Sequence, residues 1–144
     1  MMEESVSFLS PDQARYLVEV AEEAHAGLGR FVGHEVAYDP IALQLLDEWI
    51  ERHVRQSPSP SQSTRLLWVS FLGEVFRRRH EGEWVLWGRD QRLAVLCPTE
   101  GGAPYTVDVS GQVGRRIAEG MSASLTLFYA TTSVELKRER PDLT

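Results

Sequence analysis

Apolar residues recur every three or four positions in two stretches of the first half of the chain, which is the spacing of one helix face. The first stretch contains Ala14, Leu17, Val18, Ala21 and Ala24. The segment Ser10-Pro11-Asp12-Gln13 precedes it and supplies a capping hydroxyl, a proline for the first helical position and a glutamine that can reach back. We therefore predict a helix that begins after Ser10 and ends at Gly27 and Gly29.

The second stretch follows Asp39 and Pro40, which repeat this start signal. Its apolar stripe consists of Ala42, Leu45, Leu46, Trp49 and Ile50. After this helix, the segment Ser57-Pro58-Ser59-Pro60-Ser61 favours an extended connection. Neither side of the segment has enough residues for a core of its own, so we predict one domain over residues 1–144 with an interior loop at 57–62.

The segment from about Ser63 to His80 is apolar on nearly every side, which is typical of a buried helix. Its apolar residues are Leu66, Leu67, Trp68, Val69, Phe71, Leu72, Val75 and Phe76. Gly73 lies among them at a cost of about 1 kcal/mol relative to alanine. We therefore predict that another backbone passes close to Gly73.

Three short runs of residues predict β-strands at 83–87, 92–97 and 105–109, the first two joined by a turn at 88–91. Ser110 can cap a helix that runs to Gly120, and Ser122 can cap a last helix that runs to about Arg138. Many β-branched side chains in residues 125–136 leave a strand open there as an alternative. The predicted fold is α+β, with N-terminal helices and a central buried helix packed on a small antiparallel three-stranded sheet, followed by C-terminal helices.

The charge of the chain argues against some classes of partner. The 144 residues include 15 Lys and Arg and 21 Asp and Glu, which gives a formal net charge of −6. This excess of acids disfavours a general binder of nucleic acids or anionic membranes. The start MMEESVSF lacks a signal-peptide pattern, and no apolar run approaches the roughly 20 residues of a membrane helix. We expect a soluble, cytoplasmic protein with no membrane partner.

Four motifs carry a family resemblance. They are Phe71-Leu72-Gly73-Glu74-Val75-Phe76-Arg77-Arg78, Gly82-x-Trp84, Val113-x-Arg115-Arg116-x-x-x-Gly120 and Ser124-Leu125-x-x-Phe128-Tyr129. Their order and spacing resemble a widespread uncharacterised bacterial family with the patterns "LGEV.RR", "GG.W" and "V.KR..NG...SL..FY". The chain departs from the family at Glu119, where the family has Asn, and at Ser110-Gly111, where it has Pro-Phe. The resemblance implies the fold and a bacterial origin but no activity, and it favours Trp84 over Trp87 as the buried tryptophan.

Two segments resemble cofactor-binding or metal-binding motifs in part, but their spacing or their context does not match those motifs. The glycines of residues 27–33 follow a helix rather than a strand, and their last spacing is one residue too long for a dinucleotide loop. Glu22-x-x-His25 is half of a di-iron signature, but Ile50 stands where His53 would need its glutamate. Cys97 is expected in the core. We expect no cofactor, no metal and no catalytic residue.

Glu74 is the most informative residue, because it stands on the otherwise apolar third helix. A buried carboxylate needs a partner, and we predict an ion pair with Arg78, or with Arg115 or Arg116 from the helix after the sheet. The alternative is a general base with a raised pKa in a pocket beside Trp84. These five residues form the candidate ligand-binding site. Arginines and tryptophans of this half could also bind nucleic acid, but nearby acids nearly cancel their charge.

The sequence leaves two functions open. The first is a non-catalytic module that binds another protein or itself, suggested by acidic N-terminal helices and by the lack of a catalytic constellation. The acids expected to form a solvated face are Glu19, Glu22, Glu23, Asp47, Glu48 and Glu51. The alternative is a small ligand-binding domain or enzyme with a site around Glu74, Trp84 and the nearby arginines. We favour the interaction module.

Overall fold

The structure is a computed structural model that describes residues 5–138 of the chain. Over this range the chain forms five α-helices, one short 3-10 helix and four strands. In chain order these are β1 (Val6–Phe8), α1 (Pro11–Val32), α2 (Pro40–Gln56), α3 (Gln62–Arg79), β2 (Glu83–Trp87), β3 (Arg92–Cys97), β4 (Tyr105–Val107), α4 (Val109–Glu119), η1 (Gly120–Ala123) and α5 (Leu125–Arg138). The predicted α+β class is confirmed.

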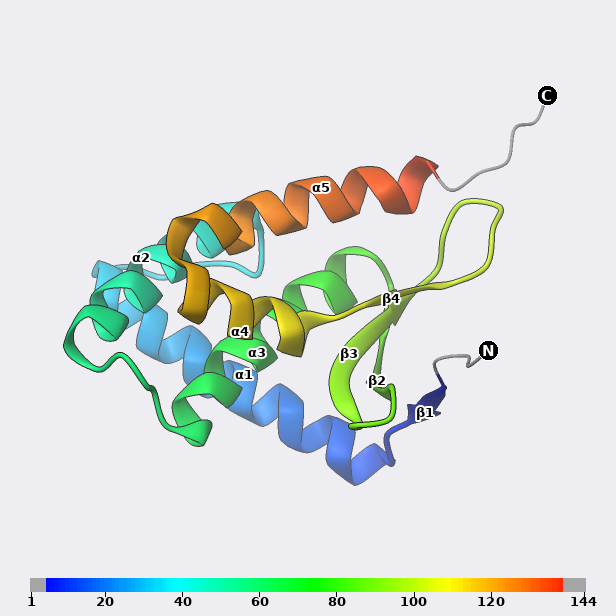
Figure 1. Cartoon of the computed structure of the whole chain (residues 1–144), viewed down its shortest axis with the longest axis horizontal. Helices are drawn as coiled ribbons and strands as arrows, with labels where there is room; N and C mark the ends of the chain where they lie inside the picture. The colour runs from blue at the N-terminus through cyan, green and yellow to red at the C-terminus, as the bar shows by residue number, and fades with distance from the viewer. Residues whose placement is uncertain (1–4, 139–144) are drawn as a thin grey trace.

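The strands form one antiparallel sheet in the order β1-β2-β3-β4, which stands at one end of the molecule (Figure 1). The prediction of three strands is wrong, because β1 adds a fourth. Val6 lies opposite Trp87 and Phe8 opposite Val85, so β1 forms one edge of the sheet. A strand of three residues is too short to show an alternating pattern, and its partner lies far away in the sequence.

The helices pack in layers beside the sheet. α3 and α4 contact β3, α1 packs on α3, and α5 runs along α2 in the opposite direction (Figure 1). Every residue of α3 from Trp68 to Phe76 is buried. The prediction of a central buried helix is therefore confirmed.

Gly73 makes room for a side chain rather than for a backbone. The indole ring of Trp84 occupies the space in which any larger residue at position 73 would place its Cβ. The prediction of a close backbone is therefore wrong, although the close approach itself is present. Trp84 is buried as predicted, whereas Trp87 is half-buried under the guanidinium of Arg92, 5.1 Å from its ring centre.

The first helix is longer than predicted. α1 continues through Gly27 and Gly29 to Val32, and Gly33 ends it in the left-handed conformation, with φ of 85°. Gly27 lies against the ring of Trp49 on α2, so its missing side chain serves the contact between the two helices. The prediction that Gly27 and Gly29 end the helix is therefore wrong.

The helix after the sheet begins slightly earlier than predicted. β4 ends at Val107, and α4 follows with Asp108 as its cap. The carboxylate of Asp108 accepts a hydrogen bond from the amide of Gly111 at 2.9 Å. Ser110, the predicted cap, lies inside α4.

Residues 125–138 form a helix and not a strand. The hydroxyl of Ser124 accepts a hydrogen bond from the amide of Leu127 at 3.0 Å, so Ser124 rather than Ser122 caps α5. Within residues 5–138, no helix combines the length and the apolar character that crossing a membrane requires.

Candidate functional site

Glu74 lies on α3 with its carboxylate enclosed, at 0% exposure. Arg77 donates to it twice, from Nε to Oε2 at 2.7 Å and from Nη2 to Oε1 at 2.8 Å. Arg78 Nε donates to Oε1 at 2.8 Å, and Trp84 Nε1 donates to Oε2 at 2.8 Å. The predicted ion pair with Arg78 is present, and Arg77 is a second partner that the sequence analysis did not name.

These donors keep Glu74 charged. Burial by itself raises the pKa of Glu74. The hydrogen bonds from Arg77, Arg78 and Trp84 lower the pKa by more than burial raises it, so the pKa lies below its ordinary value. A general base that works near neutral pH needs the opposite shift. The geometry therefore favours a structural ion pair over a general base.

Arg78 also joins Glu74 to a stack of rings. Its guanidinium carbon lies 3.8 Å from the ring centre of Tyr38, which is a cation–π contact. Tyr38 stacks in turn on His25, with ring centres 5.0 Å apart. His25 Nε2 donates to the carbonyl of Val36 at 2.6 Å. His25 therefore holds the connection between α1 and α2 against the helices.

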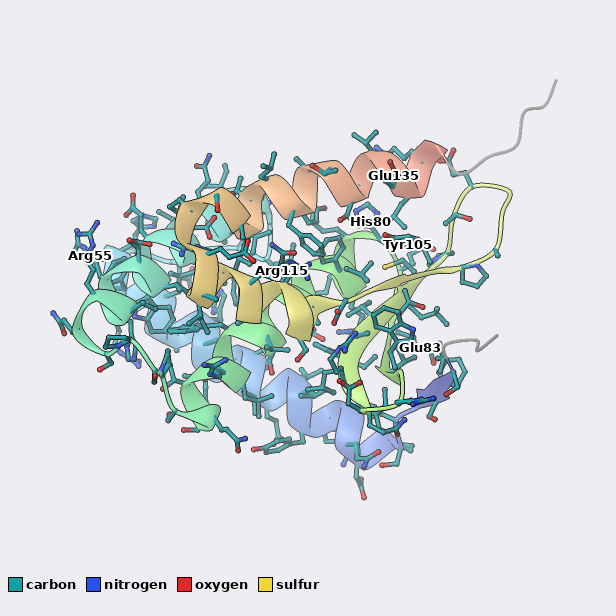
Figure 2. All side chains as sticks on the ribbon, viewed as in Figure 1. Arg55, His80, Glu83, Tyr105, Arg115 and Glu135 are labelled. Carbon is teal, nitrogen blue, oxygen red and sulfur yellow. The ribbon has the colours of Figure 1, made fainter. Side chains whose placement is uncertain are left out.

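Arg115, labelled on α4 in Figure 2, and Arg116 on the same helix do not bond to Glu74. Arg115 Nη2 donates to Gln112 Oε1 at 2.6 Å. Arg116 is bound to α2 instead. Of the five candidate residues, the structure brings together Glu74, Arg78 and Trp84, and it places the two arginines of α4 elsewhere.

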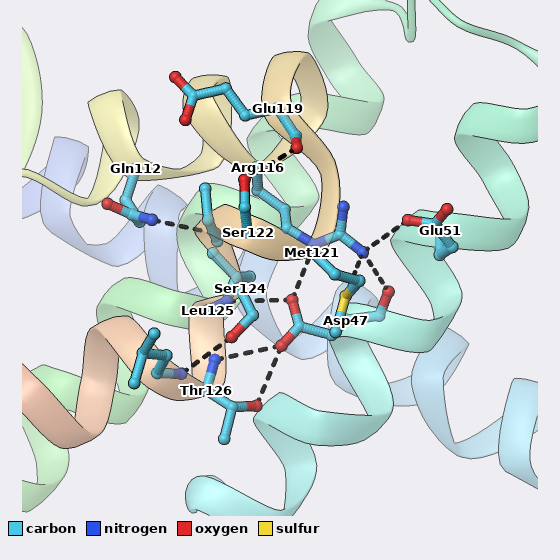
Figure 3. A network of polar contacts seen from close by, with 12 residues as sticks. Asp47, Glu51, Gln112, Arg116, Glu119, Met121, Ser122, Ser124, Leu125 and Thr126 are labelled. Atoms are coloured by element: carbon cyan, nitrogen blue, oxygen red, sulfur yellow. Dashed lines mark hydrogen bonds and ion pairs between the residues drawn. The ribbon is translucent and has the colours of Figure 1, made fainter.

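Asp47 and Arg116 form a second buried ion pair (Figure 3). Asp47 is 2% exposed and Arg116 is 1% exposed. Arg116 Nε donates to Asp47 Oδ1 at 2.9 Å, and its Nη2 donates to the Asp47 carbonyl at 3.0 Å. The same Nη2 donates to Glu51 Oε1 at 2.9 Å. One guanidinium thus ties α4 to two successive turns of α2.

Asp47 also caps α5 (Figure 3). Its Oδ1 accepts from the amide of Leu125 at 3.0 Å, and its Oδ2 accepts from the amide and the hydroxyl of Thr126 at 3.1 and 3.0 Å. Amides in the first turn of a helix lack intrahelical partners, and the helix dipole favours a negative charge there. The carboxylate of Asp47 therefore fixes α2, α4 and α5 relative to one another.

The prediction that Asp47 belongs to a solvated acidic face is wrong. Asp47 stands four residues after Leu43 and three before Ile50, and both of these are buried. This spacing puts Asp47 on the buried face of α2 and could have predicted its burial. The prediction of exposure relied instead on the charge of the aspartate. The other acids predicted at the surface and found exposed there are Glu19, Glu22, Glu23 and Glu48.

His80 joins the end of α3 to α5 (Figure 2). Its Nε2 lies 3.0 Å from Ser133 Oγ and 3.3 Å from the hydroxyl of Tyr129. Burial lowers the pKa of His80, and the charges of Lys137 and Arg79 lower it as well. Both hydroxyls lie within hydrogen-bond distance of Nε2, and the tautomer of the ring decides which atom donates. This contact links two helices, and the sequence analysis did not predict it.

Cys97 is buried in the core, as predicted. Burial raises the pKa of its thiol to about 12, so the thiol stays protonated at neutral pH. Among the residues that the structure describes, no group of three or more His, Cys, Asp or Glu side chains is placed to hold a metal ion.

Over residues 125–134 the outward side of α5 carries no charge. Leu127 is 60% exposed and Val134 is 52% exposed, and Ala130 and Thr131 between them are exposed as well. Their spacing places these four residues on one stripe, the α5 stripe. Every residue from Leu125 to Val134 is uncharged. Surface helices ordinarily turn charged and polar residues outward, so the α5 stripe is the candidate binding surface.

Comparison of the chain with protein-family models, curated proteins and solved structures finds no match. The bacterial family suggested by the sequence motifs therefore stays a prediction.

Proposed function

We propose that the protein is a non-catalytic interaction module that pairs with a second copy of itself through the α5 stripe. The observation that carries this proposal is the uncharged and partly apolar outward side of α5 over residues 125–134, where Leu127 and Val134 are more than half exposed. The two buried carboxylates support it, because both are taken up by structural contacts: Glu74 binds Arg77 and Arg78 of its own helix and Trp84 of β2, and Asp47 joins α2, α4 and α5.

A second copy fits the charge of the molecule. Each chain has a formal net charge of −6, and exposed acids such as Glu22 and Glu48 lie on α1 and α2. Like charges that face each other across an interface oppose association. The α5 stripe lets two copies meet without such a pair. A twofold axis uses the same patch on both subunits, so Leu127 of one copy can pack near Val134 of the other.

The size of the stripe sets the expected affinity. From Leu127 to Val134 the helix spans two turns, or about 10 Å. A standard stable interface buries about 800 Å² on each partner, which is more than such a stripe offers by itself. We therefore expect a reversible dimer with a Kd in roughly the micromolar range or weaker.

Sedimentation velocity over a wide range of protein concentration tests the proposal. The native chain should shift from monomer to dimer as its concentration rises. The double variant Leu127→Glu, Val134→Glu should stay monomeric, because it places two charges in the contact. Tyr105→Glu is the matched control, since Tyr105 is also an exposed large hydrophobic residue but lies on β4.

Circular dichroism first establishes that each variant is folded. A native chain that stays monomeric at the highest concentration contradicts the proposal. So does a dimer that Tyr105→Glu disrupts as strongly as the α5 double variant does.

A further inference from the structure

A groove of a different kind lies where the starts of α1 and α3 meet the sheet. It has a volume of about 420 Å³, and five of its eight lining residues are Leu9, Leu17, Leu66, Leu86 and Leu93. Leu86 and Leu93 lie directly opposite each other on β2 and β3. We call this hollow the leucine groove. Its mostly apolar lining and its size are typical of sites for small ligands.

A second hollow of about 430 Å³ adjoins the leucine groove and shares Leu66 and Leu93 with it. Its polar lining residues are Gln62, Ser63, Arg65 and Ser110, from the first turns of α3 and α4. We call it the polar hollow. We call the two adjoining hollows together the depression; its leucine groove is mostly apolar, and its polar hollow carries the polar side chains.

The uncompensated charge of this depression is positive. Asp12 and Arg65 are its charged lining residues. Asp12 is already paired with Arg15 at 2.8 Å. Arg65 uses Nε on the carbonyl of Pro60 at 3.3 Å, and over residues 5–138 its two terminal nitrogens have no hydrogen-bond acceptor. A guanidinium with two parallel N–H groups to spare at the polar end matches a carboxylate.

We propose that this depression binds a single-chain carboxylate amphiphile, with the hydrocarbon chain among the leucines and the carboxylate on Arg65. A methylene group takes up about the volume of a water molecule, roughly 30 Å³, so a chain of roughly ten carbons needs about 300 Å³. The leucine groove, at about 420 Å³, is large enough for the chain of a medium-chain fatty acid. The site shares no residue with the α5 stripe, so the proposed binding of a fatty acid does not depend on the proposed dimer.

Calorimetric titration of the full chain with decanoate, kept below its micelle concentration, tests this site. One decanoate should bind per chain and saturate, and decanol should bind about fivefold more weakly because it lacks the charge. Arg65→Gln should reduce decanoate binding to the level of decanol. Arg79→Gln, at the exposed other end of α3, is the matched control and should leave binding unchanged.

A variant of the groove wall tests the apolar end. Leu86→Gln should weaken decanoate and decanol alike, because it acts on the chain and not on the carboxylate. If circular dichroism shows that this variant is unfolded, Leu66→Gln replaces it. Equal affinity for decanoate and decanol, or full decanoate binding by Arg65→Gln, overturns the proposal.

Vesicles of phosphatidylcholine and phosphatidylglycerol separate a free ligand from a lipid surface. The protein should stay in solution when these vesicles are sedimented. Sedimentation with the vesicles, without saturable decanoate binding, assigns the groove to a membrane surface and overturns the proposal. The absence of both kinds of binding overturns it as well.

Discussion

The carboxylate of Asp47 holds three helices, and its removal should therefore be costly. Asp47→Ala deletes the acceptor for four hydrogen bonds, donated by Arg116 Nε, the amides of Leu125 and Thr126, and the Thr126 hydroxyl. Arg116 keeps its bonds to the backbone carbonyl at position 47 and to Glu51, but it loses its fully buried counter-charge. Removing one partner of a buried ion pair costs about 3–5 kcal/mol.

Loss of the cap on α5 adds to this cost. A lost helix cap is worth about 1 kcal/mol, and Ser124 retains part of the capping of α5. We expect Asp47→Ala to lower the free energy of unfolding by about 4 kcal/mol. In a chain of this size each kcal/mol lowers Tm by about 2–4 °C, so Tm should fall by about 10 °C or more. Guanidinium unfolding followed by circular dichroism measures the free energy, and calorimetry measures Tm.

Glu48→Ala is the matched control for this experiment. Glu48 is the next residue of α2 and is exposed, so its replacement should change the free energy of unfolding by less than about 0.5 kcal/mol. A double-mutant cycle with Arg116→Met should give a coupling energy on the order of 1–3 kcal/mol. A loss of less than about 1 kcal/mol in Asp47→Ala, or no coupling to Arg116, refutes this account of the network.

Two further perturbations test the surroundings of Glu74 and Gly73. Gly73→Ala should destabilise the protein by about 1–3 kcal/mol because its methyl group meets the ring of Trp84, whereas Gly114→Ala, in open space on α4, should stabilise it by up to about 1 kcal/mol. Chemical unfolding of both variants checks this, and equal effects contradict it. The pKa of folded Glu74 lies below its ordinary value of 4.5, so its contribution to stability is present above that pH and is lost as the pH falls through the folded pKa. The difference in unfolding free energy between the native chain and Glu74→Gln should therefore shrink in acid, and an NMR titration that places the pKa of Glu74 above 4.5 contradicts this.

The starts of α1 and α2 could be predicted because their signals are local. Ser10 and Gln13 exchange hydrogen bonds of 3.1 and 2.9 Å between side chain and backbone, as the sequence predicted. Asp39 accepts from the amide of Ala42 at 2.8 Å. In both cases the capping residue and its partner are three positions apart, so the chain needs no tertiary contact to form the cap.

Features that depend on a distant partner were missed. Gly27 would ordinarily weaken a helix, but α1 continues through it because the ring of Trp49 on α2 packs there. The edge strand β1 exists because Val6 and Phe8 pair with β2. Neither partner can be read from the neighbouring residues.

The two buried carboxylates show most clearly the difference between a partner that is near in the sequence and one that is distant. Glu74 finds Arg77 and Arg78 within one helical turn, so an ion pair could be predicted from spacing alone. Asp47 finds Arg116 at a distance of 69 positions and the amide of Leu125 at 78. The charge of an acidic side chain on a helix favours exposure to water. Its spacing from apolar residues can nevertheless place it on the face of the helix that is turned to the core. Which tendency prevails depends on whether donors arrive from elsewhere in the fold, because burial without them would be too costly. The apolar spacing around Asp47 could therefore be seen in the sequence, but the donors that make its burial favourable could not.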